Sequence, residues 1–383
     1  MKQSTKKSRD NYNIELLRII ALFCVLGCHY CMNHRFMQDG ITPNIKTVFL
    51  DSFMHVGAQI FFVISGFYMF DKDRKLVEVF KHIIVKILLP SYLIVFLGNM
   101  LNDYVYGNAS LWQCISELRV DWRGFFYTII HWSNDGANAF HLWFMFSLAQ
   151  IYLLYPVLKL ICKQDEKITG IRRYVLVISI ISLSIKPTLD AMLGKSIAFA
   201  PYIFAVVPVV YILIGYELKQ IYVVHLPKRQ SDVICSLSGM VMFIIGCFTT
   251  FLLSYYVDIG NNGIYSEIFV EYNMFGLLIA TVGLTLFGLS VHIPRGKIAD
   301  TIQFIGSKTF AAYLLHVLIQ RRLITLGLET NMAKLFSNEY IVAIVCILIY
   351  FILSVLMACI IDWLKLLYHI IVDGKSTELS MEN

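Results

Sequence analysis

Long apolar runs alternate with short polar segments along nearly the whole chain. Runs rich in leucine, isoleucine, valine and phenylalanine recur at roughly 14–32, 51–70, 79–101, 140–160, 174–192, 201–218, 234–256, 271–291, 307–325 and 340–367. Most are close to the length of about 20 residues that a helix needs to cross a bilayer. The pattern therefore predicts an all-α polytopic membrane protein with about ten transmembrane helices.

Composition agrees with this pattern. Of the 383 residues, 58% are hydrophobic and only 15% are charged, and the mean hydropathy is +0.67. A chain this apolar is not a soluble domain. We expect one membrane domain at 14–368, between a basic segment at 1–13 and a C-terminal tail at 369–383. No small-residue cleavage site ends the first apolar run, so we expect that run to stay in the membrane.

The distribution of basic residues predicts the orientation. With the N-terminus in the cytoplasm, 21 of the 32 lysines and arginines lie on the cytoplasmic side and nine on the other, while Arg18 and Lys86 lie within apolar runs. Positive charge favours the cytoplasmic side, so both termini are predicted there. The net charge of +6 is thereby explained as a topology signal, and we expect no nucleic-acid partner.

Cysteine usage gives no metal or disulfide framework. The nine cysteines are scattered, most of them within apolar runs, and buried thiols in such runs usually behave as small hydrophobic side chains. Cys28-His-Tyr-Cys31 matches C-x-x-C, but the second half of a zinc site is missing from the sequence. We therefore expect no metal.

The first apolar run carries the most informative polar residues. Arg18 and His29 are eleven residues apart, which places both on one face of a helix, about 16 Å apart along its axis. Glu15, Leu22 and Val25 share that face. Ionisable groups inside a membrane are costly and indicate function. A structural alternative is that Arg18 pairs with Glu15 near the interface and that His29 hydrogen-bonds a neighbouring helix.

Three further motifs follow in later runs. They are GAQIFFVISGFY, which starts at Gly57, HLWFMF, which starts at His141, and GSKTFAAYLLH, which ends at His316. Together with Arg18-x10-His29 they resemble acyltransferase family 3, the bacterial integral-membrane acyltransferases that modify surface polysaccharides. The resemblance covers nearly the whole chain.

Two positions depart from the family pattern. Ile19 stands where the family usually has glycine, and Lys86, before Pro90, stands where a basic residue of the third helix is commonly arginine. Neither change removes a charge that the chemistry needs. Lysine does, however, offer a point charge where arginine offers a planar fork.

The resemblance implies transfer of an acyl group, most often acetyl, from cytoplasmic acyl-CoA to a hydroxyl of a cell-surface or lipid-linked glycan. The protein would lie in the bacterial cytoplasmic membrane, with acyl-CoA as a substrate and no permanently bound cofactor. His29 is the candidate base, because imidazole titrates near neutral pH. Arg18 would contact the donor and assist the transfer, and Lys86 is a second candidate for the CoA phosphates. The acceptor could approach from the outer half of the membrane, so that CoA need not cross it.

Several side chains are candidates for positioning the substrates: Glu15, Ser65, His141, Trp143, Tyr313 and His316. Structural alternatives stay open for some of them. Ser65 could serve helix packing beside Gly66, and Lys86 could simply extend to the cytoplasmic interface. His141 and His316 could each position a substrate or tie two helices together.

Two other classes of function are also compatible with many membrane helices. A transporter or flippase of a glycan or lipid-linked precursor could use helix breaks such as those at Pro201 and Pro208. A membrane receptor or non-enzymatic subunit is the third class. An enzyme would consume acyl-CoA, a transporter would move its cargo without consuming it, and a receptor would do neither.

Overall fold

The computed structural model describes residues 2–37, 39–118, 120–131, 140–163, 165–195, 206–225 and 229–373. These residues fold into helices joined by short loops, which confirms the all-α prediction. The helices up to the bend near Leu154 are α1 (Lys2–His34), α2 (Ile45–Met54), α3 (Gly57–Met69), α4 (Leu76–His82), η1 (Ile83–Leu88), α5 (Leu89–Met100), α6 (Asn102–Val105), α7 (Leu111–Ser116), α8 (Trp122–His131), η2 (Phe140–Leu142) and α9 (Trp143–Leu153).

The second half of the chain continues in the same way. Its helices are α10 (Tyr155–Ile161), α11 (Glu166–Ile180), η3 (Ile181–Ile185), α12 (Lys186–Leu193), α13 (Val207–His225), α14 (Arg229–Leu253), η4 (Ser254–Ile259), α15 (Gly260–Asn262), η5 (Ile268–Val270), α16 (Phe275–Ser290), α17 (Lys297–Thr325), α18 (Leu328–Leu335) and α19 (Glu339–Asp373). Three of the short elements, η1, η3 and η4, are π-helical insertions within longer helices.

Eight helical stretches among the described residues are long and apolar enough to cross a membrane. They are Tyr12–His34, Ile45–Met69, Leu76–Met100, Glu166–Leu193, Val233–Ile259, Ile268–Ser290, Lys297–Thr325 and Glu339–Leu366. A ninth is the pair Phe140–Leu153 and Tyr155–Ile161, which is bent by 65°. The bend precedes Pro156, whose ring and missing N–H prevent a continuous helix. The chain is thus a multi-pass membrane protein.

The remaining predicted crossing, at 201–218, overlaps α13. The first residues of that predicted run lie outside the described part of the chain, and the helix is described from Val207. Every apolar run named above therefore has a helical counterpart, although hydropathy alone placed several helix ends a few residues away from where they lie.

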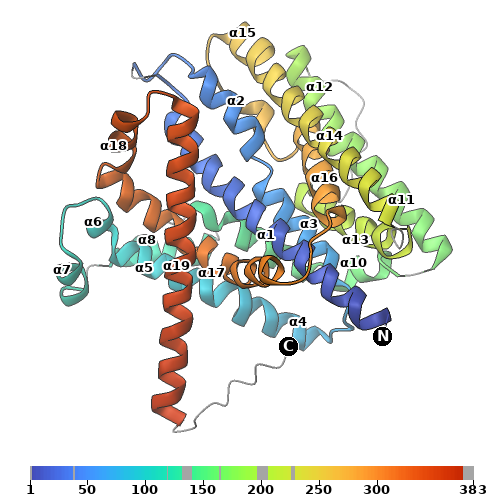
Figure 1. The fold of residues 1–383 in the computed structure, drawn as a ribbon, viewed down its shortest axis with the longest axis horizontal. Coiled ribbons are helices and arrows are strands. Elements are labelled where there is room, and N and C mark those ends of the chain that lie inside the picture. Colours follow the sequence, from blue (N-terminus) through green and yellow to red (C-terminus); the bar gives the residue numbers. More distant parts are fainter. Residues whose placement is uncertain are drawn as a thin grey trace.

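Helix α1 passes through the middle of the bundle (Figure 1). Helices α11, α12, α14 and α16 gather on one side of it, and α18 and α19 lie on the other. Accordingly Leu17, Leu22 and Leu26 of α1 are fully buried. The beginning of α1 and the end of α19 lie toward the same side of the molecule.

Small residues set the distance between two central helices. A side chain on Gly66 of α3 would collide with the backbone carbonyl of Ile212 in α13, and one on Gly215 would collide with the carbonyl of Val63. Close backbone approach of this kind is a main source of helix association in membranes. The glycine of the SGF motif is therefore required by packing.

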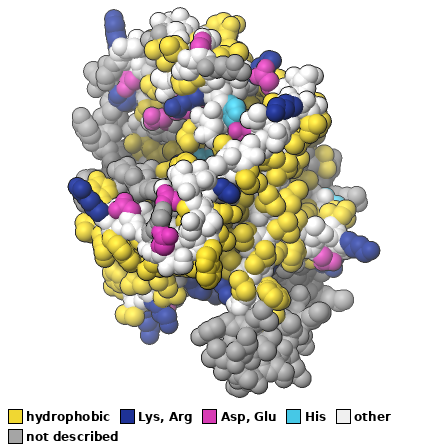
Figure 2. All heavy atoms as spheres, turned by 90° about the vertical axis from the view of Figure 1, so that its left-hand side faces the viewer, with side chains coloured by type: hydrophobic (Ala, Val, Ile, Leu, Met, Phe, Trp, Pro, Cys, Tyr) yellow, Lys and Arg dark blue, Asp and Glu magenta, His cyan; other side chains and the backbone are white. Residues whose placement is uncertain are grey.

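The outer faces of the bundle are apolar, as a lipid-exposed surface must be. Hydrophobic side chains cover much of the face shown in Figure 2, and a histidine lies in a hollow among acidic and basic side chains in its upper part. Exposed apolar residues form stripes on α14 and α19: Val233, Leu237, Val241, Ile244 and Phe248 on the first, and Leu348, Ile352, Leu356 and Leu364 on the second.

Candidate functional site

Helix α17 packs along the face of α1 that carries the Arg18-x10-His29 motif. At one end a side chain on Gly306 would collide with Glu15, so the two helices touch there. At the other end the rings of His29 and His316 stack, with centroids 5.1 Å apart and an angle of 22° between the planes. Since both contacts advance toward the C-terminus on each helix, α1 and α17 run in the same direction. The polar stripe of α1 thus faces the protein interior.

Several of the predicted site residues meet at the His29 end of this contact. His141, in η2, packs edge-on against His316 with centroids 4.8 Å apart, and Tyr313 lies 5.7 Å from His141. The rings of Phe140 and His29 lie perpendicular to each other, with centroids 5.0 Å apart. His141 and His316 are completely enclosed, whereas His29 is half-buried. Three histidines far apart in sequence therefore form one cluster.

Backbone hydrogen bonds fix the orientation of two of these histidines. His141 Nε2 lies 3.1 Å from the carbonyl oxygen of Leu314, and His316 Nδ1 lies 2.5 Å from that of Tyr313. A carbonyl only accepts, so each of these nitrogens carries the hydrogen. In the neutral rings the other nitrogens, His141 Nδ1 and His316 Nε2, are bare acceptors, and neither has a partner among the described residues. The Tyr313 hydroxyl also donates to the His141 carbonyl at 2.5 Å.

His29 lies between two cavities. The larger, of about 480 Å³, is polar on several sides and is lined by residues that include His29, Asn33, His34, Tyr106, Gln320, Arg321 and Glu329. Its volume is typical of small-molecule sites. The smaller, of about 30 Å³, is lined by residues that include Cys28, His29, His55, His141, Trp143, Tyr272 and Tyr313. His29 Nδ1 is buried without a partner in the described part of the chain.

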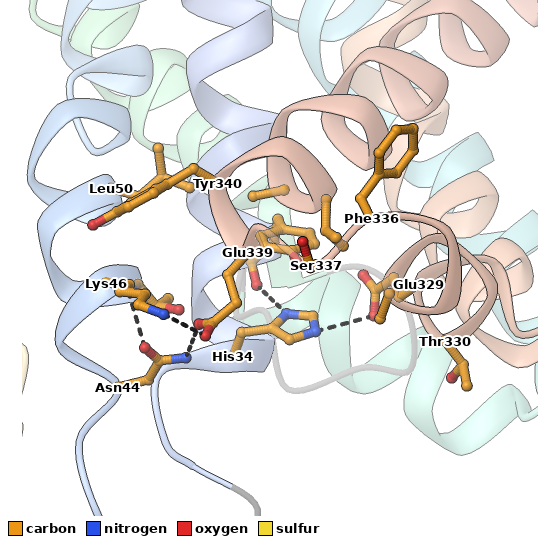
Figure 3. Close-up of a pocket in the computed structure, with 15 residues that line it drawn as sticks. His34, Asn44, Lys46, Leu50, Glu329, Thr330, Phe336, Ser337, Glu339 and Tyr340 are labelled. Atoms are coloured by element: carbon orange, nitrogen blue, oxygen red, sulfur yellow. Dashed lines mark hydrogen bonds and ion pairs between the residues drawn. The ribbon is translucent and has the colours of Figure 1, made fainter.

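A further cavity of about 490 Å³ adjoins the larger one and shares His34 and Glu329 with it. Figure 3 shows His34 pointing toward Glu329 from the end of α1. His34 Nε2 lies 3.4 Å from Glu329 Oε2, and its Nδ1 donates to the carbonyl of Tyr30 at 2.9 Å. At the rim Lys46 pairs with Glu339 at 2.7 Å. Charged and hydrogen-bonding side chains therefore line a path that leads from the cavity at His29 into this neighbouring cavity.

Arg18 and Glu15 form an ion pair near the opposite end of the α1 stripe. Arg18 Nη1 lies 2.6 Å from Glu15 Oε1, and 34% of the Arg18 side chain is exposed. The local pairing named above as a structural alternative is thus present. It does not occupy the whole guanidinium, which has five N–H groups, so Arg18 can still contact a second anion.

The other candidates divide into two groups. Trp143 lines the small cavity and packs on Tyr272, with ring centroids 4.6 Å apart. Ser65 and Lys86 line neither cavity at His29. The Ser65 hydroxyl donates to the Phe61 carbonyl one turn earlier at 2.8 Å, and Lys86 is exposed on η1.

The structure adds a polar group that sequence reasoning missed. His55 lies between Asp51 and Cys28, with Nδ1 2.7 Å from Asp51 Oδ1 and Nε2 3.4 Å from Cys28 Sγ. The signal in the sequence is an aspartate and a histidine four residues apart in an apolar run, which puts them on one helix face. These three side chains are also the one group among the described residues with metal-ligand atoms within 4.8 Å of one another.

Comparison with known proteins places this arrangement in a family. No curated protein and no solved structure gives a significant match. The sequence model of acyltransferase family 3 (Acyl_transf_3, an acyltransferase domain) matches residues 11–363. That range includes α1, the three histidines and α17. The chain therefore belongs to acyltransferase family 3 and is a membrane acyltransferase.

Proposed function

We propose that this protein transfers a small acyl group, acetyl in the simplest case, from cytoplasmic acyl-CoA to a hydroxyl of a cell-surface or lipid-linked glycan in a bacterial cytoplasmic membrane. One observation carries the proposal. His29 is a half-buried imidazole that lines both a polar cavity of about 480 Å³ and a small one of about 30 Å³, and its Nδ1 has no partner among the described residues. Acyl transfer needs a base where the acceptor hydroxyl meets the thioester, and this position of His29 supports that role.

The role of His29 follows from the chemistry of the transfer. The acceptor oxygen attacks the thioester carbonyl carbon while its proton passes to the base, and the carbon–sulfur bond then breaks. His29 takes the proton and returns it to the departing thiolate. Stacking on His316 restrains the plane of the His29 ring, and the backbone hydrogen bond of His316 in turn restrains His316. The base is therefore held in one orientation before the substrates arrive.

The donor is proposed to approach from the Arg18 end of α1. The partly exposed guanidinium can hold a phosphate of CoA, and its ion pair with Glu15 orients it. Arg18 and His29 are about 16 Å apart along a regular helix, a gap that extended pantetheine can cover. Lys86, exposed on η1, is a second proposed phosphate contact. CoA then stays on the cytoplasmic side throughout.

The acceptor is proposed to enter from the other end. The two cavities of about 480 and 490 Å³ share His34 and Glu329 and are lined by amide, imidazole, carboxylate and guanidinium groups. A hydroxyl-rich sugar offers both donors and acceptors to such a surface, and each cavity is in the size range of ligand sites. The acceptor hydroxyl would reach His29 through the cavity that His29 itself lines.

The test uses the full chain in lipid nanodiscs with acetyl-, propionyl- and succinyl-CoA and a panel of glycans. We expect release of free CoA thiol that requires a glycan and that equals the amount of acylated glycan found by mass spectrometry. In proteoliposomes, movement of glycan without thiol release would instead indicate a transporter and contradict the proposal. If thiol is released at a rate that no glycan increases, the proposed glycan acceptor would be contradicted, whereas the proposed acyl-CoA donor would not.

A further inference from the structure

A series of hydrogen-bonded polar side chains begins at Cys28, one residue before His29. Cys28 Sγ lies 3.4 Å from His55 Nε2, and His55 Nδ1 lies 2.7 Å from Asp51 Oδ1. The other oxygen of Asp51 accepts a hydrogen bond of 3.0 Å from the hydroxyl of Tyr265. Asp51 is 2% exposed and Tyr265 is 3% exposed, so this series of side chains is anchored in the protein core. Its free end is the thiol of Cys28.

The chemistry of these groups determines which one donates and which one accepts in each hydrogen bond. The Asp51 carboxylate only accepts, so His55 Nδ1 donates to it. In the neutral ring, His55 Nε2 is then the acceptor for the Cys28 thiol. Burial and the nearby Asp51 raise the pKa of Tyr265 well above its usual range, so its hydroxyl stays protonated and donates to Asp51. A nucleophile, a base beside it and a third group that orients the base form the arrangement of an activated thiol.

The thiol lies beside the proposed acyl-transfer base. Cys28 and His29 line the same small cavity, together with Trp143 and Tyr272. The volume of about 30 Å³ is small beside the 480 Å³ of the larger cavity, so the space next to Sγ suits a small group. An acyl group on Cys28 would therefore be held where His29 can direct a hydroxyl toward it.

We infer that Cys28 carries the acyl group as a thioester between CoA and the acceptor. The inference rests on the proposed function for its donor, acyl-CoA. In the first step the Cys28 thiol gives its proton to His55, and the sulfur attacks the donor carbonyl. The bond from that carbonyl to the CoA sulfur breaks, and CoA leaves as the thiol with the proton from His55. One thioester replaces another, with no oxidation or reduction.

In the second step the acceptor hydroxyl gives its proton to His29 and its oxygen attacks the acyl-cysteine carbonyl. The bond to Cys28 Sγ breaks, an ester remains on the acceptor, and the thiolate recovers the proton from His29. Each of the two histidines thus serves one half of the transfer, His55 the loading of Cys28 and His29 its unloading. Asp51 and Tyr265 are positioning residues for His55.

A metal ion on the same three side chains is the competing explanation. Ligands of a metal direct one lone pair each at a common point. Here His55 directs a different ring nitrogen at each of the other two groups, Nδ1 at Asp51 and Nε2 at Cys28, although one atom of each of the three side chains lies within 4.8 Å of the others. This geometry favours proton transfer along the chain over binding of an ion.

The primary experiment incubates the full chain in nanodiscs with each acyl-CoA in the absence of acceptor. We expect intact mass to increase by one acyl group, peptide mapping to place it on Cys28, and neutral hydroxylamine to remove it, as it removes thioesters. Adding glycan to loaded wild-type protein should discharge it. The His29→Ala variant should load but fail to discharge.

Matched variants separate chemistry from folding. Cys28→Ser should lower glycan-dependent CoA release about 100-fold or more, whereas Cys24→Ser, one turn earlier on α1, should leave it within about twofold. His55→Ala should slow loading about 100-fold, and added imidazole should restore part of the rate, which a purely structural role would not allow. Asp51→Asn should slow loading less than His55→Ala.

The outcomes distinguish this inference from the proposed function. Normal glycan-dependent CoA release by Cys28→Ser would overturn the acyl-cysteine while leaving the proposed function in place. Failure of wild-type protein both to load and to release CoA would overturn the acyl-CoA donor, and the acyl-cysteine with it. Stoichiometric zinc in purified protein, lost in Cys28→Ser, together with no loading, would show a metal site instead.

Discussion

The imidazole rings of His29 and His316 stack 5.1 Å apart although 287 positions separate them in the sequence. The contact joins the first long helix to the ninth apolar run, and it places a half-buried ring against one that is fully enclosed. Because His316 is held by the Tyr313 carbonyl, the contact transmits a fixed orientation to His29. His316 is thereby expected to act through His29.

This relationship predicts non-additive kinetics. His316→Ala should lower kcat about 10- to 100-fold with little change in KM, because the bound substrates are retained while the base loses its orientation. In the His29→Ala background, His316→Ala should lower kcat by a much smaller factor. A double-mutant cycle of kcat measures this coupling. Equal losses in both backgrounds would show that His316 acts independently of His29.

Arg18 is predicted to act on the donor. Arg18→Ala should raise KM for acyl-CoA about tenfold or more and change kcat by less, since it removes a charge-assisted contact to phosphate. An acyl-pantetheine donor without phosphates should show no such difference between variant and wild type. Lys167→Ala removes an exposed lysine from α11 and is the control. A fall in kcat alone, with unchanged KM, would contradict a donor contact.

Close packing of α3 against α13 predicts a pair of opposite effects on stability. Gly66→Ala puts a methyl group against the Ile212 carbonyl and should destabilise by about 1–3 kcal/mol or more, because backbone cannot move aside easily. Gly170→Ala, on α11, meets no atom within 4 Å and should stabilise by about 0.5–1 kcal/mol. Thermal unfolding in one detergent compares both. Similar melting temperatures would contradict the tight contact.

A buried ion pair joins α11 and α13. Replacing one partner should lower the stability of the fold much more than replacing both partners with apolar residues. Arg172 Nε lies 2.5 Å from Glu217 Oε1, and the two side chains are 2% and 10% exposed. Arg172→Met should cost about 3 kcal/mol, since Glu217 keeps its charge in the interior and retains only the exposed Arg173, whose Nε lies 3.3 Å from Oε2. Arg172→Met with Glu217→Leu should recover most of that loss. A double variant less stable than the single one would show that the pair itself stabilises the fold.

The sequence contained the membrane architecture because lipid imposes a simple requirement. A helix that crosses a bilayer needs a continuous apolar run, so hydropathy found a counterpart of every crossing. The bend at Pro156 and the π-helical insertions, such as η1, did not follow from hydropathy, since they depend on local hydrogen bonding. The overlap of the predicted 201–218 run with α13 shows the usual error in helix ends.

The candidate site was predictable in part. Helical periodicity put Arg18 and His29 on one face, and the family motifs drew attention to His141, Tyr313 and His316. Which of these side chains meet is a property of how α1, η2 and α17 pack, which no local pattern encodes. The same holds for Cys28 and His55, which lie on different helices and approach only in the folded protein.

The most direct test of the account compares glycan-dependent CoA release by wild type, His29→Ala and His292→Ala in nanodiscs. His292 is an exposed histidine in the loop after α16, so it controls for loss of an imidazole. We predict a loss in kcat of about 100-fold or more for His29→Ala, in the range for removal of a general base, and no change for His292→Ala. Full activity of folded His29→Ala protein would contradict the central claim.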